Sequence, residues 1–125
     1  MYLWRALGPK FKEDTRMARD EGLEELLREL LQAEPGITEQ AMFGGRAWLL
    51  NGNLLCGARD DGMLVRLGKN NDVWALEIDD IAPMISRGKP MPGWVRAGPM
   101  AFGDDALRER LIEAALTFVR SLPAK

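Results

Sequence analysis

The chain has 125 residues, of which 46% are hydrophobic, and this is enough for one domain with a single core. Its net charge of −2 gives no general attraction to nucleic acid, and no apolar run is long enough for a membrane-spanning helix. The absence of histidine excludes Ser-His-Asp and Cys-His catalysis and removes the commonest metal ligand. We therefore expect a protein that is not an enzyme and that holds no metal and no cofactor.

The N-terminal residues and the single cysteine bear on location. Residues 1–16 contain neither a long apolar segment nor a small-residue cleavage site, so they are not typical of a secretory signal. Cys56 can form no disulfide within the chain, which fits the reducing cytoplasm. We expect a cytoplasmic protein in which residues 1–16 are a poorly ordered extension and residues 17–125 form the domain.

The first half of the domain is predicted to be one helix followed by a strand meander. The helix covers residues 20–33, where leucines follow the 3–4 spacing of a buried face, and Pro35-Gly36 ends it. Strands are predicted over residues 37–43, 46–50, 53–59 and 63–67. Asn51-Gly52 and Asp61-Gly62 favour tight two-residue turns, so these strands form antiparallel hairpins.

The second half contains two further helices. A short helix capped by Asn70 or Asn71 is predicted to run to about residue 78. Residues 81–93, rich in Pro and Gly, are predicted to be irregular, and residues 94–97 to form an edge strand. The last helix begins near Asp104 and carries an apolar stripe. The elements together predict an α+β fold.

The tight turns also predict a register for the sheet. Leu49 is expected to face Leu54, Ala47 to face Cys56, and Ala58 to face Val65. Because side chains alternate along a strand, one face is wholly apolar and is expected to pack against the helices. Its members are Ala47, Leu49, Leu54, Cys56, Ala58, Val65 and Leu67. The opposite face carries Trp48, Leu50, Leu55, Gly57, Arg59, Leu64 and Arg66.

The second of these faces contains the predicted contact site. Its large apolar side chains would be exposed there, and such a patch is typical of an interaction surface. Either a segment of the same chain, such as residues 81–91 or 1–16, covers the patch, or another molecule does. A second copy related by a two-fold axis is the simplest such molecule. The predicted interaction surface consists of Trp48, Leu50, Leu55, Arg59, Leu64, Arg66 and Trp94.

Two parts of this surface have a second interpretation. Arg59 and Arg66, beside Trp48, could form a patch that binds a small anion or nucleic acid. Trp94, framed by Pro92-Gly93, is either an exposed anchor for a partner or a core side chain that fixes the irregular segment. The balanced charge of the whole chain favours a protein partner over nucleic acid.

Three other motifs are interpreted as structural. Gly44-Gly45 lacks the flanking residues of a phosphate loop and is expected to be a bend. Cys56 falls on the apolar face without a histidine partner and is expected to be an inert buried thiol. Asp60-Asp61 and Asp79-Asp80 are expected to make local hydrogen bonds at turns rather than to bind a cation.

Several segments, taken in order, resemble the N-terminal domain of the TfoX/Sxy family. They are Met42–Arg46, Trp48–Gly52, Gly62–Leu67 and Pro90–Val95, and the similarity covers residues 19–122. The resemblance implies a two-layer antiparallel sheet with helices on one face, secretion-chaperone-like, in the order α-β(3)-α-β-α. It also implies a bacterial regulatory or adaptor module that acts through protein contacts. The family's competence regulators carry a second, C-terminal domain, and no such domain follows in this sequence.

Overall fold

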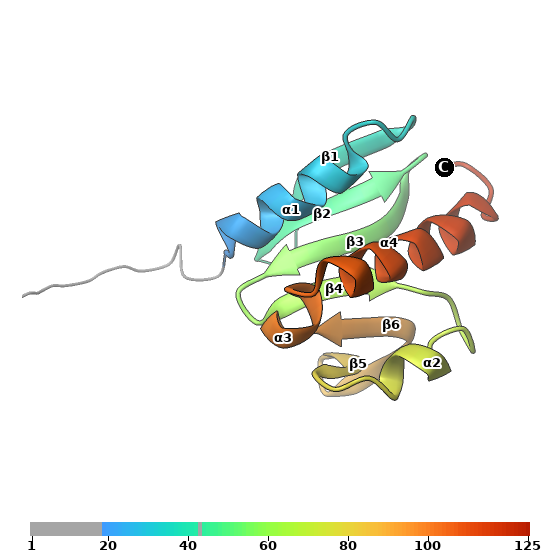
Figure 1. Ribbon diagram of the computed structural model, residues 1–125. Helices are drawn as coiled ribbons and strands as arrows, with labels where there is room; N and C mark the ends of the chain where they lie inside the picture. Colours follow the sequence, from blue (N-terminus) through green and yellow to red (C-terminus); the bar gives the residue numbers. More distant parts are fainter. Residues whose placement is uncertain (1–18, 43) are drawn as a thin grey trace, which may run out of the picture.

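The computed structural model describes residues 19–42 and 44–125. The predicted extension, residues 1–16, lies outside the described residues, as does Phe43. In chain order the elements are α1 (Glu21–Leu31), β1 (Ile37–Met42), β2 (Gly45–Leu50), β3 (Asn53–Arg59), β4 (Gly62–Arg66), α2 (Val73–Leu76), β5 (Ile81–Ser86), β6 (Lys89–Ala97), α3 (Pro99–Phe102) and α4 (Asp105–Arg120). Figure 1 shows an α+β fold with one six-stranded antiparallel sheet, in the strand order β1-β2-β3-β4-β6-β5.

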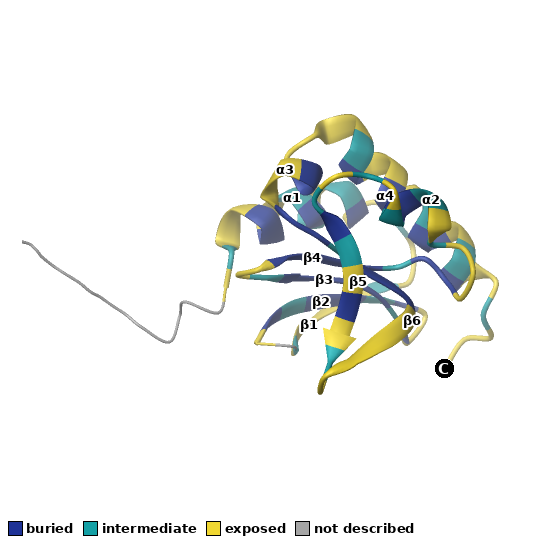
Figure 2. Ribbon diagram, turned by 90° about the horizontal axis from the view of Figure 1, so that it is seen from below, coloured by how far each residue is buried: buried dark blue, intermediate teal, exposed yellow. Residues whose placement is uncertain are grey.

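The helices of the described part all lie on one side of this sheet (Figure 2). Each of the two long helices is preceded by an aspartate whose side chain accepts a hydrogen bond from the backbone amide of the third helical residue, Asp20 from Leu23 and Asp104 from Leu107. α4 packs on β3 and β4, and α1 contacts β3. No helix in the described ranges is both long and apolar enough to cross a membrane.

The Pro-rich segment predicted to be irregular is a hairpin of two strands. β5 and the first half of β6 span it, with Arg87-Gly88 at the turn. Pro83 is compatible with β5 because this strand lies at an edge of the sheet. A backbone N–H that points outward from an edge strand has no hydrogen-bond partner in the sheet, so a proline can replace the residue without breaking a bond. The predicted edge position of residues 94–97 is wrong, since β6 lies between β4 and β5.

The order of elements also differs from the order that the family resemblance implied. Four strands precede α2 and two follow it, where three and one were expected. The chain then ends in two helices, α3 and α4, rather than one. The expectation of helices on one side of an antiparallel sheet holds, while the finer element order does not.

A bulge in β3 changes which side chains share a face. Leu49 pairs with Leu54 as predicted, but the register then shifts, and Trp48 pairs with Cys56 and Ala47 with Gly57. Leu55 is therefore the extra residue of β3, and the alternation reverses beyond it. In the next hairpin the turn is Asp60-Asp61, one residue earlier than predicted, so Cys56 rather than Ala58 pairs with Val65.

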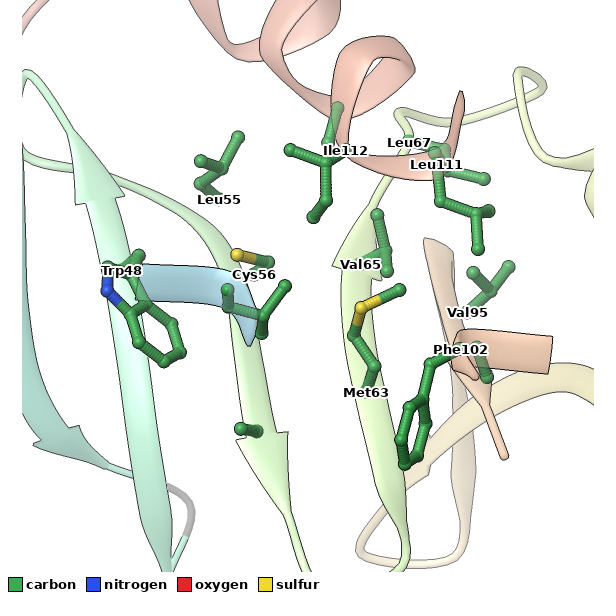
Figure 3. Packing of buried hydrophobic residues seen from close by; sticks show 14 of the residues in the cluster. Trp48, Leu55, Cys56, Met63, Val65, Leu67, Val95, Phe102, Leu111 and Ile112 are labelled. Atoms are coloured by element: carbon green, nitrogen blue, oxygen red, sulfur yellow. The ribbon is translucent and has the colours of Figure 1, made fainter. Parts of the chain in front are cut away.

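The core under the helices consequently contains residues from both predicted faces. Trp48, Leu50 and Leu55, which were expected to be exposed, are 1%, 2% and 0% exposed. They belong to one buried cluster with Cys56, Ala58, Val65 and residues of α1 and α4, part of which Figure 3 shows. The prediction that these three side chains form a contact surface is wrong, because the helices cover the face that carries them.

The helix-free side of the sheet has a smaller core of its own. Leu64, Met84 and Trp94 form a second buried cluster, with Leu54 packed against it. Met84 belongs to β5, so residues of the predicted covering segment 81–91 do cover Leu64. Leu64 is fully buried and not exposed as predicted. Trp94 is 8% exposed, which confirms the core alternative for this side chain.

Candidate interaction groove

The structure separates the predicted interaction surface into two groups. Trp48, Leu50 and Leu55 lie in the core beneath the helices. The other predicted residues lie on or beside the helix-free side: Arg59, Leu64, Arg66 and Trp94. Only Arg66 and Trp94, which are cross-strand partners, line a hollow on this side.

This hollow, which we call the hairpin groove, lies between the β5–β6 hairpin and the edge of the sheet where β3 begins and β4 ends. It has a volume of about 230 Å³ and is lined by Gly52, Leu54, Arg66, Met84, Met91, Trp94 and Lys125. Sequence reasoning missed Leu54, Met84, Met91 and Lys125. Of these, only Met91 had a signal in the sequence, because it stands between two prolines, which neither a helix interior nor a central strand accommodates.

Gly93 sets the position of the hairpin beside the groove. Its φ is +82°, and its carbonyl oxygen accepts hydrogen bonds from the amides of Leu67 (2.7 Å) and Gly68 (3.1 Å). A Cβ at this position would lie 2.5 Å from the carbonyl carbon of Gly68. Only glycine therefore allows β6 to approach residues 67–69 so closely and to bend there.

The walls of the groove are apolar, and the two charged side chains that line it are cationic, while the backbone carbonyl carbon and oxygen of Lys125 lie beside Gly52. Leu54, Met84, Met91 and Trp94 provide the apolar surface. The guanidinium of Arg66 donates a hydrogen bond to the carbonyl of Leu54 (3.2 Å) and lies 5.6 Å from the ring centre of Phe118.

Two hydrogen bonds of the last residues position Lys125, whose side chain is the other cation. Its backbone amide donates a hydrogen bond to the carbonyl of Asn51 (2.9 Å). The side chain of Asn53 holds the same segment, since it donates a hydrogen bond to the carbonyl of Pro123 (2.9 Å). These two bonds place Lys125 beside the β2–β3 turn, opposite the hairpin.

The apolar and cationic surface of the groove continues along the β5–β6 hairpin. Ile85 and Met91 are 52% and 36% exposed, which makes them two of the four large apolar side chains that the described part of the chain leaves in water. The hairpin from Ile81 to Ala97 contains no acidic residue, and Arg87 lies in its turn with Lys89 directly after it. The apolar surface of the hairpin is therefore bordered by positive charge.

Arg59 takes no part in this groove. Its guanidinium forms two hydrogen bonds with the carboxylate of Asp61, at 3.0 and 2.9 Å. Arg96 donates a hydrogen bond to the carbonyl oxygen of the same aspartate (2.8 Å). These contacts hold the β3–β4 turn, so the predicted patch of Arg59 and Arg66 beside Trp48 is not formed.

A larger hollow, of about 700 Å³, lies on the helix side between α2 and α4. Its main aromatic walls are Trp74 and Phe118. Both rings already have a cation against them, since Arg110 lies 4.0 Å from the ring centre of Trp74 and Arg66 lies 5.6 Å from that of Phe118. Because the stacking surfaces are engaged within the chain, we favour the hairpin groove as the candidate site.

The cysteine, the aspartates and the glycine pair that the sequence analysis interpreted as structural lie in the core or at turns. Cys56 is fully buried, and its burial raises the pKa of the thiol far above the ordinary range. The carboxylate of Asp80 accepts hydrogen bonds from the amides of Met100 (2.8 Å) and Ala101 (3.4 Å) at the start of α3. Gly44 has a φ of +78° between β1 and β2. Residues 19–42 and 44–125 contain no group of three or more side chains that could hold a metal ion.

The comparisons with known proteins add no relative. The chain matches no protein-family model, no curated protein and no solved structure.

Proposed function

We propose that the chain is a non-enzymatic regulatory or adaptor module that binds a partner protein through the hairpin groove. The observation that carries the proposal is an apolar groove whose two charged lining side chains, those of Arg66 and Lys125, are both cations. The partner that fits is an extended segment with apolar side chains next to aspartate or glutamate. Apolar burial would supply the affinity, and charge would supply the specificity.

The resemblance to the TfoX/Sxy N-terminal domain supports a role of this kind. It rests on sequence segments that include Pro90–Val95, the part of the hairpin that carries Met91. We propose that the chain is a member of that family and shares its secretion-chaperone-like layering of helices on one side of an antiparallel sheet, with the different element order described above. A cytoplasmic location is part of the same proposal, since the single cysteine needs no oxidising compartment.

The buried ring of Trp94 and the paired guanidinium of Arg59 favour a protein partner over the alternative of a nucleic acid. Aromatic rings stack on bases only when their faces are open, and Trp94 is 8% exposed. The guanidinium of Arg59 is already paired with Asp61. Arg66 alone among the predicted patch residues contributes to the groove.

Two labelled peptide pools test the proposal. One combines Leu, Ile and Phe with Asp and Glu, and the other combines the same apolar residues with Lys and Arg. We expect fluorescence anisotropy to show binding of the acidic pool roughly tenfold tighter than that of the basic pool, a difference of ~1.4 kcal/mol. A single-stranded DNA oligonucleotide is the third probe.

Each probe has a result that contradicts the proposal. Equal binding of the two pools would show that the cations do not select the ligand. Binding of the oligonucleotide that is tighter than binding of the acidic pool and falls steeply with salt would support the nucleic-acid alternative. Apolar contacts, by contrast, should weaken little with added salt.

A further inference from the structure

The two edges of the sheet differ in how they are protected against another strand. At β5, Pro83 removes a backbone N–H, and the register with β6 shifts between Pro83 and Ile85. Both features hinder pairing with a further strand. At β1, six consecutive pairs with β2 run from Ile37 to Met42 without a shift, and the strand contains neither proline nor lysine. Among the described residues, no strand pairs with the outer side of β1.

The backbone of β1 presents its hydrogen-bonding groups in a regular pattern. The carbonyl of Gly36 accepts a hydrogen bond from the amide of Asn51 (3.0 Å) and so points toward β2, and across the trans peptide bond the N–H of Ile37 points away from β2. Successive residues of a strand point these groups to opposite sides. The N–H and C=O groups of Ile37, Glu39 and Ala41 therefore point outward, and residues 38–41 are exposed, although the side chain of Glu39 is only 25% exposed.

We propose that β1 is a dimerisation edge, at which β1 of a second copy of this chain pairs antiparallel and joins the two sheets into one. A two-fold axis perpendicular to the sheet keeps the helices of both copies on the same side. Directly opposed residues of antiparallel strands share a face. The axis must therefore lie between one residue of β1 and the same residue of the second copy, so that this residue faces itself.

Overlap and charge together select the position of the axis, because only an axis at Glu39 or Gln40, the two central residues of β1, lets five residues of each strand pair. An axis at Glu39 would place two carboxylates directly opposite each other, which is unfavourable. An axis at Gln40 places Gln40 opposite its own copy, and Glu39 opposite Ala41 of the second copy. Glu39 and Ala41 then exchange both backbone hydrogen bonds, because the groups of both residues point outward.

The side chains above this junction are balanced in charge. The guanidinium of Arg28 donates hydrogen bonds to Glu39 (3.0 and 2.8 Å) and to Glu25 (2.9 Å). Arg46 lies 3.6 Å from the carboxylate of Glu39. Each copy thus brings two arginines and two glutamates to the helix side of the junction. The helix side of the junction is therefore neutral in each copy, so a two-fold contact brings no net like charge against itself.

The test uses opposite charges at the axis. Sedimentation velocity over a range of concentrations should show reversible dimerisation of the wild type, because a single added strand buries a small interface. Gln40→Lys and Gln40→Glu should each weaken the dimer roughly tenfold or more, since like charges then face each other. An equimolar mixture of the two variants should dimerise again. Ser86→Lys, which adds the same charge at the β5 edge, is the matched control and should leave the dimer intact.

Three results would overturn the proposal. The first is a wild type that stays monomeric at every accessible concentration. The second is Gln40→Lys dimerising as well as the wild type. The third is a mixture of the variants that associates no better than either one alone. Circular dichroism and thermal melting of each variant show whether lost association reflects lost folding. The peptide pools probe the hairpin groove, so their result is independent of this one.

Discussion

Replacing Leu55 by Ala tests the bulge in β3 and the face that the helices cover. Leu55 is 0% exposed and belongs to the core cluster with residues of α1 and α4. The substitution removes three carbon atoms, worth ~0.8 kcal/mol each in transfer free energy. The cavity that remains raises the cost to about 3 kcal/mol in free energy of unfolding. Leu54→Ala, one residue earlier on the half-exposed helix-free side, should cost about 1 kcal/mol.

Urea denaturation of the two variants and the wild type measures this difference. Tryptophan fluorescence and circular dichroism should give coincident transitions with unchanged slopes, so that the midpoints report stability alone. We expect Leu55→Ala to lower the melting temperature by roughly 12 °C or more, because 1 kcal/mol corresponds to about 4–8 °C in a domain of this size. A loss of stability in Leu54→Ala equal to or larger than that in Leu55→Ala would refute the bulge and the assignment of the faces.

Three further predictions concern an ion pair, the thiol and the bend of the hairpin. The Arg28 guanidinium lowers the pKa of Glu39 by hydrogen bonding. Glu39→Gln should therefore lower the free energy of unfolding by about 1 kcal/mol or less at pH 7. In urea titrations the difference from the wild type should disappear as the pH falls below the ordinary glutamate pKa of 4.5 and through the lowered pKa of Glu39 in the folded protein. A difference that persists at low pH would exclude the ion pair as its cause. Cys56 should react with Ellman's reagent only as fast as the domain unfolds, and rapid labelling of the native protein would show that the thiol is accessible. Gly93→Ala should cost roughly 1–3 kcal/mol, because the positive φ is strained for alanine and its Cβ would meet Gly68; a melting temperature equal to that of the wild type would contradict the bend.

The parts of the fold that follow from local chemistry were predictable. Asn51-Gly52 favours a tight turn, and this turn sets the observed pairing of Leu49 with Leu54. Leucine spacing predicted α1, and Asp104 predicted the start of α4. In each case the residues that determine the element lie within a few positions of one another.

The two main errors in the predicted fold arose where contacts between distant residues determine the structure. Nothing in the sequence around Leu55 marks a bulge, since no proline stands there and the neighbours are apolar on both sides. One extra residue nevertheless reverses the alternation and moves Trp48 and Leu50 from an expected surface into the core. Pro83 and Pro90 argued against strands, although the edge position of β5 makes a proline compatible with the sheet.

The candidate site was only partly predictable for the same reason. Arg66 and Trp94 were singled out because of their residue types, and they are partners in neighbouring strands. Met84 and Met91 reach the groove because the hairpin bends at Gly93, a contact that depends on the three-dimensional path of the chain.

The measurement that tests the proposed function most directly is binding of the acidic peptide pool to a pair of methionine variants. Met91→Glu places a carboxylate in the groove, whereas Met100→Glu makes the same change at a methionine that is 82% exposed in α3. Fluorescence anisotropy should show affinity reduced roughly tenfold or more for Met91→Glu, because a negative charge then repels the acidic peptides, and unchanged for Met100→Glu. Equal affinities of the two variants would contradict the assignment of the hairpin groove as the binding site.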